Sequence, residues 1–246
     1  MRNIFIKISA IFLAISLSAC NRADSIDITS QSQISESSSV SSTSQGNDNS
    51  SNISGDDADS NILIAYFTWA DNAHVEEPDK VDIDATTSAS VLVPGNAAKI
   101  ADWIHRETGG DLFSIIVTEP YSSDYNECLD RAADEKAKNA RPQLAEHIDD
   151  MEKYDIVFLG FPNWWYTVPM AIHTFLEEYD FSGKTIIPFV THGTGGLAST
   201  ITDIKADLPK DVTLLDPIGV YRPEVDSSHD NVIEWLKTLD ILKEDL

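Results

Sequence analysis

Residues 156–169 read IVFLGFPNWWYTVP, in which an apolar run leads into an aromatic loop. The run 156–160 predicts a buried strand ending at Gly160, because strands covered on both faces by helices are apolar throughout. Pro169 suits the first turn of a helix, where an N–H would have no intrahelical partner. The apolar face of that helix would carry Ile172, Phe175, Leu176 and Tyr179. A strand followed directly by a helix is the building block of α/β proteins.

The same alternation extends in both directions from this unit. Four other apolar runs have the length of strands, and they lie at 61–67, 111–117, 185–190 and 212–215. Apolar residues at helical spacing follow Pro94, begin near Ser123, and recur over 197–208 and 232–239. Five strands that alternate with helices predict an α/β fold with a doubly wound five-stranded parallel sheet in three α/β/α layers.

Ligands of doubly wound sheets bind beyond the carboxyl ends of the strands, which directs attention to three loops. The loop 66–73 offers hydroxyl and amide groups that can hold a phosphate without a lysine. The loop 160–169 carries adjacent tryptophans that cannot both face one core; one is free to stack on a planar ligand, unless both form an apolar lid. The loop 191–196 has three glycines, which let the backbone approach a ligand or form an ordinary turn.

Three motifs at these loops resemble the flavodoxin-like family, in its variant with a double tryptophan after the third strand. They are YFTWADN at 66–72, LGFPNWWYTVPM at 159–170 and PFVTHGTGG at 188–196. The resemblance implies the sheet order 2-1-3-4-5 and non-covalent binding of FMN. It implies a phosphate loop of Thr68, Trp69, Ala70 and Asn72, and a ring site flanked by Pro162, Asn163, Trp164, Trp165 and Tyr166. The other ring edge would be lined by residues 191–196, among them Thr191, His192, Gly193 and Gly195.

The first loop departs from the family pattern. Ala73 stands where compact flavodoxins have Thr or Ser, and residues 74–93 intervene before the expected helix. Asn96 and the amides that follow it are therefore an alternative phosphate site to Asn72. The inserted segment could supply hydroxyl groups or cover the site. Both alternatives remain open at the level of sequence.

The remaining candidates for chemistry are weaker. The histidines form no metal-ligand cluster, so no metal site is predicted; His192, in the third loop, is an even choice between a contact with ring or substrate and none. Cys128 is expected to be an inert helix residue, because no CxxC motif or adjacent base activates it. A phosphate-ester hydrolase is disfavoured, because the sequence offers no identifiable nucleophile.

The amino-terminal residues differ in composition from the rest. In 1–19, basic residues precede a short apolar stretch, as in a secretory signal, and Leu17-Ser-Ala-Cys20 resembles the lipobox of bacterial lipoproteins. This resemblance implies that Cys20 is lipidated; an ordinary signal or a short core helix is the alternative. Residues 21–60 contain 14 serines and no aromatic residue. The segment 20–60 is thus expected to be a disordered tether, and 61–246 a folded domain.

The chain of 246 residues is strongly acidic, with 41 Asp+Glu against 17 Lys+Arg and a net charge of −24. Such charge disfavours binding of nucleic acid or anionic lipid through a basic patch, which leaves the membrane to the lipid anchor alone. We expect an exported, membrane-anchored FMN protein outside the cytoplasm that transfers electrons to a redox partner protein or reduces a small-molecule acceptor. An NAD(P)H-dependent quinone or nitro reductase, and a lipoprotein binding module without flavin, are the alternatives.

Overall fold

The computed structural model describes residues 61–88, 90–239 and 241. The predicted signal segment, Cys20 and the serine-rich segment lie outside the described residues. Within the described part of the chain, no helix is long and apolar enough to cross a membrane.

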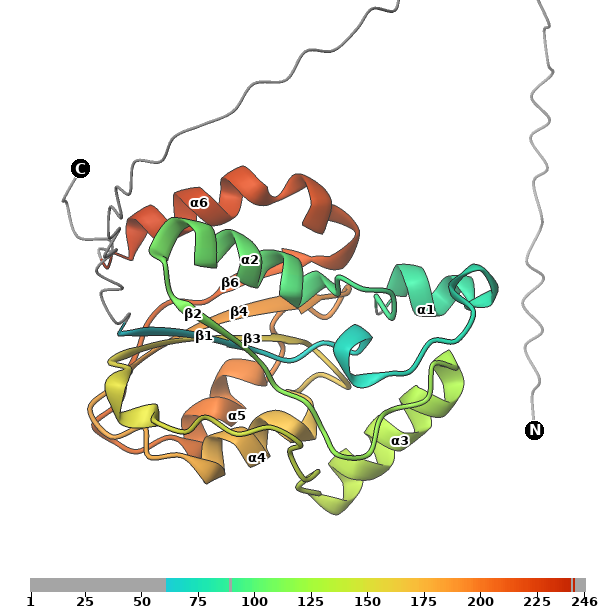
Figure 1. Cartoon of the computed structure of the whole chain (residues 1–246), viewed down its shortest axis with the longest axis horizontal. Helices are drawn as coiled ribbons and strands as arrows, with labels where there is room; N and C mark the ends of the chain where they lie inside the picture. The colour runs from blue at the N-terminus through green and yellow to red at the C-terminus, as the bar shows by residue number, and fades with distance from the viewer. Residues whose placement is uncertain (1–60, 89, 240, 242–246) are drawn as a thin grey trace, which may run out of the picture. The chain divides into compact units, whose positions relative to one another are not determined.

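A parallel sheet forms the centre of the domain (Figure 1). Its strands are β1 (Ile62–Tyr66), β2 (Asp111–Ser114), β3 (Ile156–Pro162), β4 (Thr185–His192), β5 (Thr213–Leu214) and β6 (Ile218–Tyr221). The order β2-β1-β3-β4-β5 confirms the predicted flavodoxin-like topology, and every pairing is parallel. The three strands β1, β3 and β4 are almost completely buried, as their continuous apolar sequences indicate.

The outer edge of the sheet differs from the prediction of a single fifth strand. Two short strands share the edge of β4: β5 pairs near its start, and β6 pairs with Phe189–His192 at its end. The sequence does not predict β6, because Pro217 and Gly219 are disfavoured in strands. A Cβ atom on Gly219 would lie 3.0 Å from Leu197 Cδ2 and 3.2 Å from His192 Nε2, so a larger residue would need these side chains to shift slightly.

Helices cover both faces of the sheet, which confirms the three layers (Figure 1). On one face lie α2 (Asn96–Thr108) and α6 (His229–Thr238), and on the other lie α3 (Tyr125–Lys138), α4 (Met170–Glu178) and α5 (Thr200–Asp207). Alternate residues of each strand point into the two apolar cores; for example, Ile64 packs with α2 and Leu63 lies in the opposite core. Helix α2 ends at Gly109, whose φ of 68° is the left-handed conformation expected after a helix.

The inserted segment 74–93 folds onto the domain. It contains a short helix, α1 (Ile83–Ser88), that the sequence analysis does not predict. Ala85 and Val91 are buried and fix the segment to the main core. Helix α1 contacts the 3-10 helix Arg222–Ser227, which follows β6. The insertion therefore lies at the carboxyl end of the sheet, beside the predicted site.

Candidate functional site

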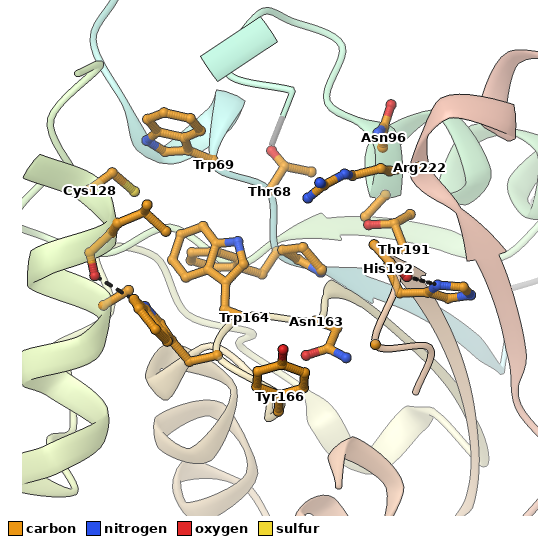
Figure 2. Close-up of a pocket in the computed structure, with 18 of the residues that line it drawn as sticks. Thr68, Trp69, Asn96, Cys128, Asn163, Trp164, Tyr166, Thr191, His192 and Arg222 are labelled. Carbon is orange, nitrogen blue, oxygen red and sulfur yellow. Dashed lines mark hydrogen bonds between the residues drawn. The ribbon is translucent and has the colours of Figure 1, made fainter. Parts of the chain in front are cut away.

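A cavity of about 360 Å³ opens at the carboxyl ends of the strands, where the loops after β1, β3, β4 and β6 meet. Of the sequence-predicted site residues, all but Ala70 and Asn72 line it; Figure 2 labels most of them. Of the range 191–196 assigned to the ring edge, Gly196 does not line the cavity either. The lining also includes residues that were not predicted from the sequence: Phe67, Ala97, Tyr125, Cys128, Leu129, Ala132 and Arg222.

The loop after β1 forms one wall of the cavity. Thr68 is 3% exposed, and its Oγ1 accepts a hydrogen bond from the Asp71 N–H at 2.9 Å. Within the described residues this hydroxyl has no acceptor for its own proton, so it is free to donate into the cavity. The Trp69 indole is buried and donates from Nε1 to the Ser122 carbonyl at 3.0 Å. The wall is therefore rigid, with one unused donor.

Asn72 has a structural position below this wall. Its Nδ2 donates to the carbonyl oxygens of Thr68 (2.8 Å) and Ile115 (3.0 Å), and its Oδ1 accepts from the Val117 N–H (2.8 Å). The side chain is 2% exposed. These bonds join the first loop to the chain that continues from β2 and leave Asn72 with little capacity for a ligand.

Asn96 lies at the cavity, despite the insertion that separates it from the first loop. It is the first residue of α2 and follows Gly95, which packs directly on Thr68. A Cβ atom on Gly95 would lie 2.7 Å from the Thr68 Cβ, so only glycine allows this approach. The two ends of the insertion therefore lie close together, and the amino terminus of α2 contacts the loop after β1.

The loop after β3 makes a tight turn at Trp165 and Tyr166. The backbone N–H and C=O groups of Trp164 and Thr167 pair in both directions, at 3.0 and 2.9 Å. Trp165 and Tyr166 both have positive φ angles, 50° and 65°, which two-residue hairpin turns of type I′ require and aromatic residues rarely adopt. Such strain persists where surrounding contacts enforce it.

Contacts from α3 and from Ser199, which directly precedes α5, hold this strained turn. Lys136 Nζ on α3 donates to the Trp165 carbonyl at 2.6 Å, and Trp165 Nε1 donates to the Leu129 carbonyl at 3.1 Å. From the other side, Ser199 Oγ donates to the Tyr166 carbonyl at 2.7 Å. The two tryptophans separate as a result. Trp164 packs edge-to-face against Phe67 and Tyr121, whereas Trp165 is 43% and Tyr166 66% exposed at the mouth of the cavity.

Replacing Tyr166 with glycine is expected to raise the free energy of unfolding by about 1 kcal/mol, because glycine adopts a positive φ without strain. Chemical denaturation of the two proteins without ligand measures this change. Tyr166→Ala is the matched control, since it removes the same ring but keeps the Cβ atom. If glycine and alanine stabilised the protein equally, removal of the exposed ring rather than relief of backbone strain would explain the effect.

The loop after β4 closes the opposite side. Asn163 joins it to the previous loop, because its N–H donates to the Thr191 carbonyl (2.8 Å) and its Nδ2 to the Gly196 carbonyl (2.6 Å). The ring of Tyr166 covers Gly195, where a Cβ atom would lie 2.9 Å from Tyr166 Cε1. His192 is partly buried, and its Nδ1 is 2.7 Å from the Gly193 carbonyl oxygen.

Cys128 and Arg222 line the cavity although neither was predicted to do so from the sequence. Cys128 lies on the inner face of α3, where burial raises the pKa of its thiol to about 12. The thiol is therefore protonated at neutral pH, in agreement with the expected inert residue. Arg222 follows β6 directly, so its position depends on a strand that the sequence analysis does not predict. An arginine directly after a strand indicates a cavity residue only if the strand itself is predicted.

Comparisons with known proteins agree with this architecture. The sequence model of the flavodoxin family matches residues 85–239. A presumed flavoprotein from Bacteroides eggerthii DSM 20697 is 26% identical, with a TM-score of 0.55 over 73% of this chain and 98% of its own. Another, from Bacteroides uniformis ATCC 8492, is 24% identical, with a TM-score of 0.55 over 72% of this chain and 98% of its own. None of the curated proteins compared with the chain matches it.

Proposed function

Because the chain belongs to the flavodoxin family, we propose that its cavity binds FMN non-covalently and that the protein transfers electrons to a redox partner protein or to a small-molecule acceptor. The observation that carries this proposal is the cavity itself, which combines an aromatic wall with a polar end at the carboxyl edge of the sheet. Bound FMN would supply the electron transfer, and the protein would supply its binding and orientation.

The residues present fit this cofactor in size and in chemistry. A cavity of about 360 Å³ lies within the usual range for cofactor sites. Trp164, Trp165 and Tyr166 offer aromatic surface to a planar ring system at one end. Thr68, Asn96 and Arg222 offer hydroxyl, amide and guanidinium groups at the other end (Figure 2). This division matches a molecule with an apolar planar part and a phosphate.

For the phosphate, we propose the amino terminus of α2 with Asn96 and Thr68. Asn72 is occupied by three hydrogen bonds with the backbone, whereas the Asn96 side chain has no hydrogen-bond partner among the described residues. The free N–H groups at the start of a helix favour an anion. We therefore assign to Asn96 the contact with the phosphate that a residue of the first loop makes in the compact family pattern.

The exposed turn at the mouth of the cavity favours electron transfer between the flavin and a molecule outside the protein. Trp165 and Tyr166 are exposed beside the cavity, so a ring bound behind them would keep an accessible edge. The chain's net charge of −24 favours a partner with a basic face. Steady-state oxidation of NAD(P)H by the loaded protein, with a quinone as acceptor, separates a reductase from a carrier; a carrier gives no turnover.

We further propose that the protein is exported and held at the membrane through a lipid on Cys20, with the domain outside the cytoplasm. The sequence Leu17-Ser-Ala-Cys20 after a basic and apolar segment supports this proposal. Fractionation of cells producing the wild type and Cys20→Ser tests it. Release of the variant from the membrane fraction is the expected result, and equal retention of both would contradict the anchor.

Addition of FMN to the purified, flavin-free protein is expected to quench FMN fluorescence at a stoichiometry of one per chain, because aromatic side chains at the ring quench its emission. Isothermal calorimetry of the same titration measures the affinity. A protein that shows no quenching and no heat of binding with FMN would instead be a binding module without flavin.

A further inference from the structure

Arg222 is a cation at the polar end of the cavity that has no partner among the residues the structure describes. It follows β6 and lines the cavity, and Figure 2 shows its guanidinium extending toward Thr68 with Asn96 nearby. Within the described residues, no hydrogen bond or ion pair engages its side chain, whereas the arginines at 106, 131 and 141 each pair with a carboxylate. In a chain of net charge −24, an arginine left unpaired in a cavity indicates an anionic ligand.

The segment that carries Arg222 is held in place. Arg222 begins the 3-10 helix Arg222–Ser227, whose Val225 is 1% exposed. Lys99 on α2 forms an ion pair with Asp226 at 2.6 Å, which joins this 3-10 helix to the helix that begins at Asn96. Burial of Val225 and packing against α2 therefore position the backbone of Arg222, and the exposed ion pair adds little to this.

The cavity wall also leaves room for the guanidinium. A Cβ atom on Gly193 would lie 3.2 Å from Arg222 Cζ and 3.3 Å from one of its terminal nitrogens. Glycine at this position thus allows the guanidinium to lie against the loop after β4. On the opposite side, the buried Thr68 hydroxyl still has a proton to donate. Donors from the loop after β1, from the start of α2 and from Arg222 after β6 thus lie at one end of the cavity.

We propose that Arg222 binds the phosphate of the flavin and makes the cavity selective for the phosphorylated cofactor over riboflavin. This inference rests on the proposed binding of FMN and adds the residue that recognises the charge of the phosphate. A planar guanidinium can donate two parallel hydrogen bonds to phosphate oxygens, which makes the contact both strong and directional. It also offsets the repulsion between a phosphate dianion and an acidic protein.

The test compares two ligands that differ only in the phosphate. Dissociation constants for FMN and riboflavin are measured on the purified chain and on Arg222→Gln. The substitution is expected to raise the constant for FMN by about ten- to a hundredfold, the range for a charge-assisted hydrogen bond, and to leave the riboflavin constant unchanged. Unchanged riboflavin binding also shows that the variant keeps a folded cavity.

Two more variants complete the test. Arg106→Gln removes the same charge from the far end of α2, where Arg106 pairs with Asp102, and is expected to leave both constants unchanged. Arg222→Lys keeps the charge without the paired donors and is expected to give an intermediate loss for FMN; it serves if Arg222→Gln does not fold. Wild-type binding of FMN no tighter than riboflavin, or equal losses in the 222 and 106 variants, would overturn the role of Arg222. Failure of both ligands to bind the wild type would refute the proposed function itself.

Discussion

Asn72→Ala is expected to lower the free energy of unfolding by about 3 kcal/mol or more, even though Asn72 does not line the cavity. The substitution removes three hydrogen bonds at a site that is 2% exposed. It leaves the Val117 N–H and two carbonyl groups unsatisfied, and each buried unsatisfied group costs about 1–3 kcal/mol. Urea denaturation followed by circular dichroism measures the loss.

Asn96→Ala is the matched control, because it makes the same chemical change at the other candidate phosphate residue. It is expected to change stability by less than about 0.5 kcal/mol, as is usual for side chains without partners. Its FMN affinity is expected to fall about two- to tenfold, the range for one neutral hydrogen bond. If Asn96→Ala left FMN affinity unchanged while folded Asn72→Ala lost it, the phosphate would be held by Asn72 and not by Asn96.

These two asparagines show how far the sequence could lead. Strand positions and the loops at their carboxyl ends are predictable from apolar runs, because a strand covered on both faces has to be apolar throughout. The role of Asn72 is not predictable, since its hydrogen bonds reach the Ile115 carbonyl and the Val117 N–H across the sheet edge. Only the closeness of Gly95 and Thr68, a tertiary contact over the insertion, shows that α2 begins at the cavity.

The strand β6 at the edge of the sheet could not be predicted from the sequence either. The residues of β6 include Gly219 and follow Pro217, so local propensity disfavours a strand there. Pairing with Phe189–His192 of the long strand β4 overrides that propensity. Because this pairing places Arg222, the motifs that revealed the other loops could not identify this arginine of the cavity lining.

Trp164→Ala is expected to lower the free energy of unfolding by about 3 kcal/mol, as for other large aromatic residues removed from packed positions. Its ring lies 5.4 Å from that of Phe67 and 5.3 Å from that of Tyr121, in edge-to-face contacts that alanine cannot replace. Because Trp164 also lines the cavity, FMN affinity is expected to fall about two- to tenfold, the equivalent of one lost aromatic stacking contact.

Trp165→Ala separates stacking from folding. Trp165 is 43% exposed and makes one hydrogen bond through its indole, to the Leu129 carbonyl. Its removal is therefore expected to reduce stability by no more than about 1 kcal/mol.

Denaturation and FMN titration of both variants give a stability loss and an affinity loss for each tryptophan. A stable Trp165→Ala protein with the larger loss of FMN affinity would place the flavin ring against the exposed turn. The larger loss in Trp164→Ala would place it against the inner wall. Unchanged affinity in both would contradict the assignment of this loop to the ring, because a flavin bound elsewhere would not sense either indole.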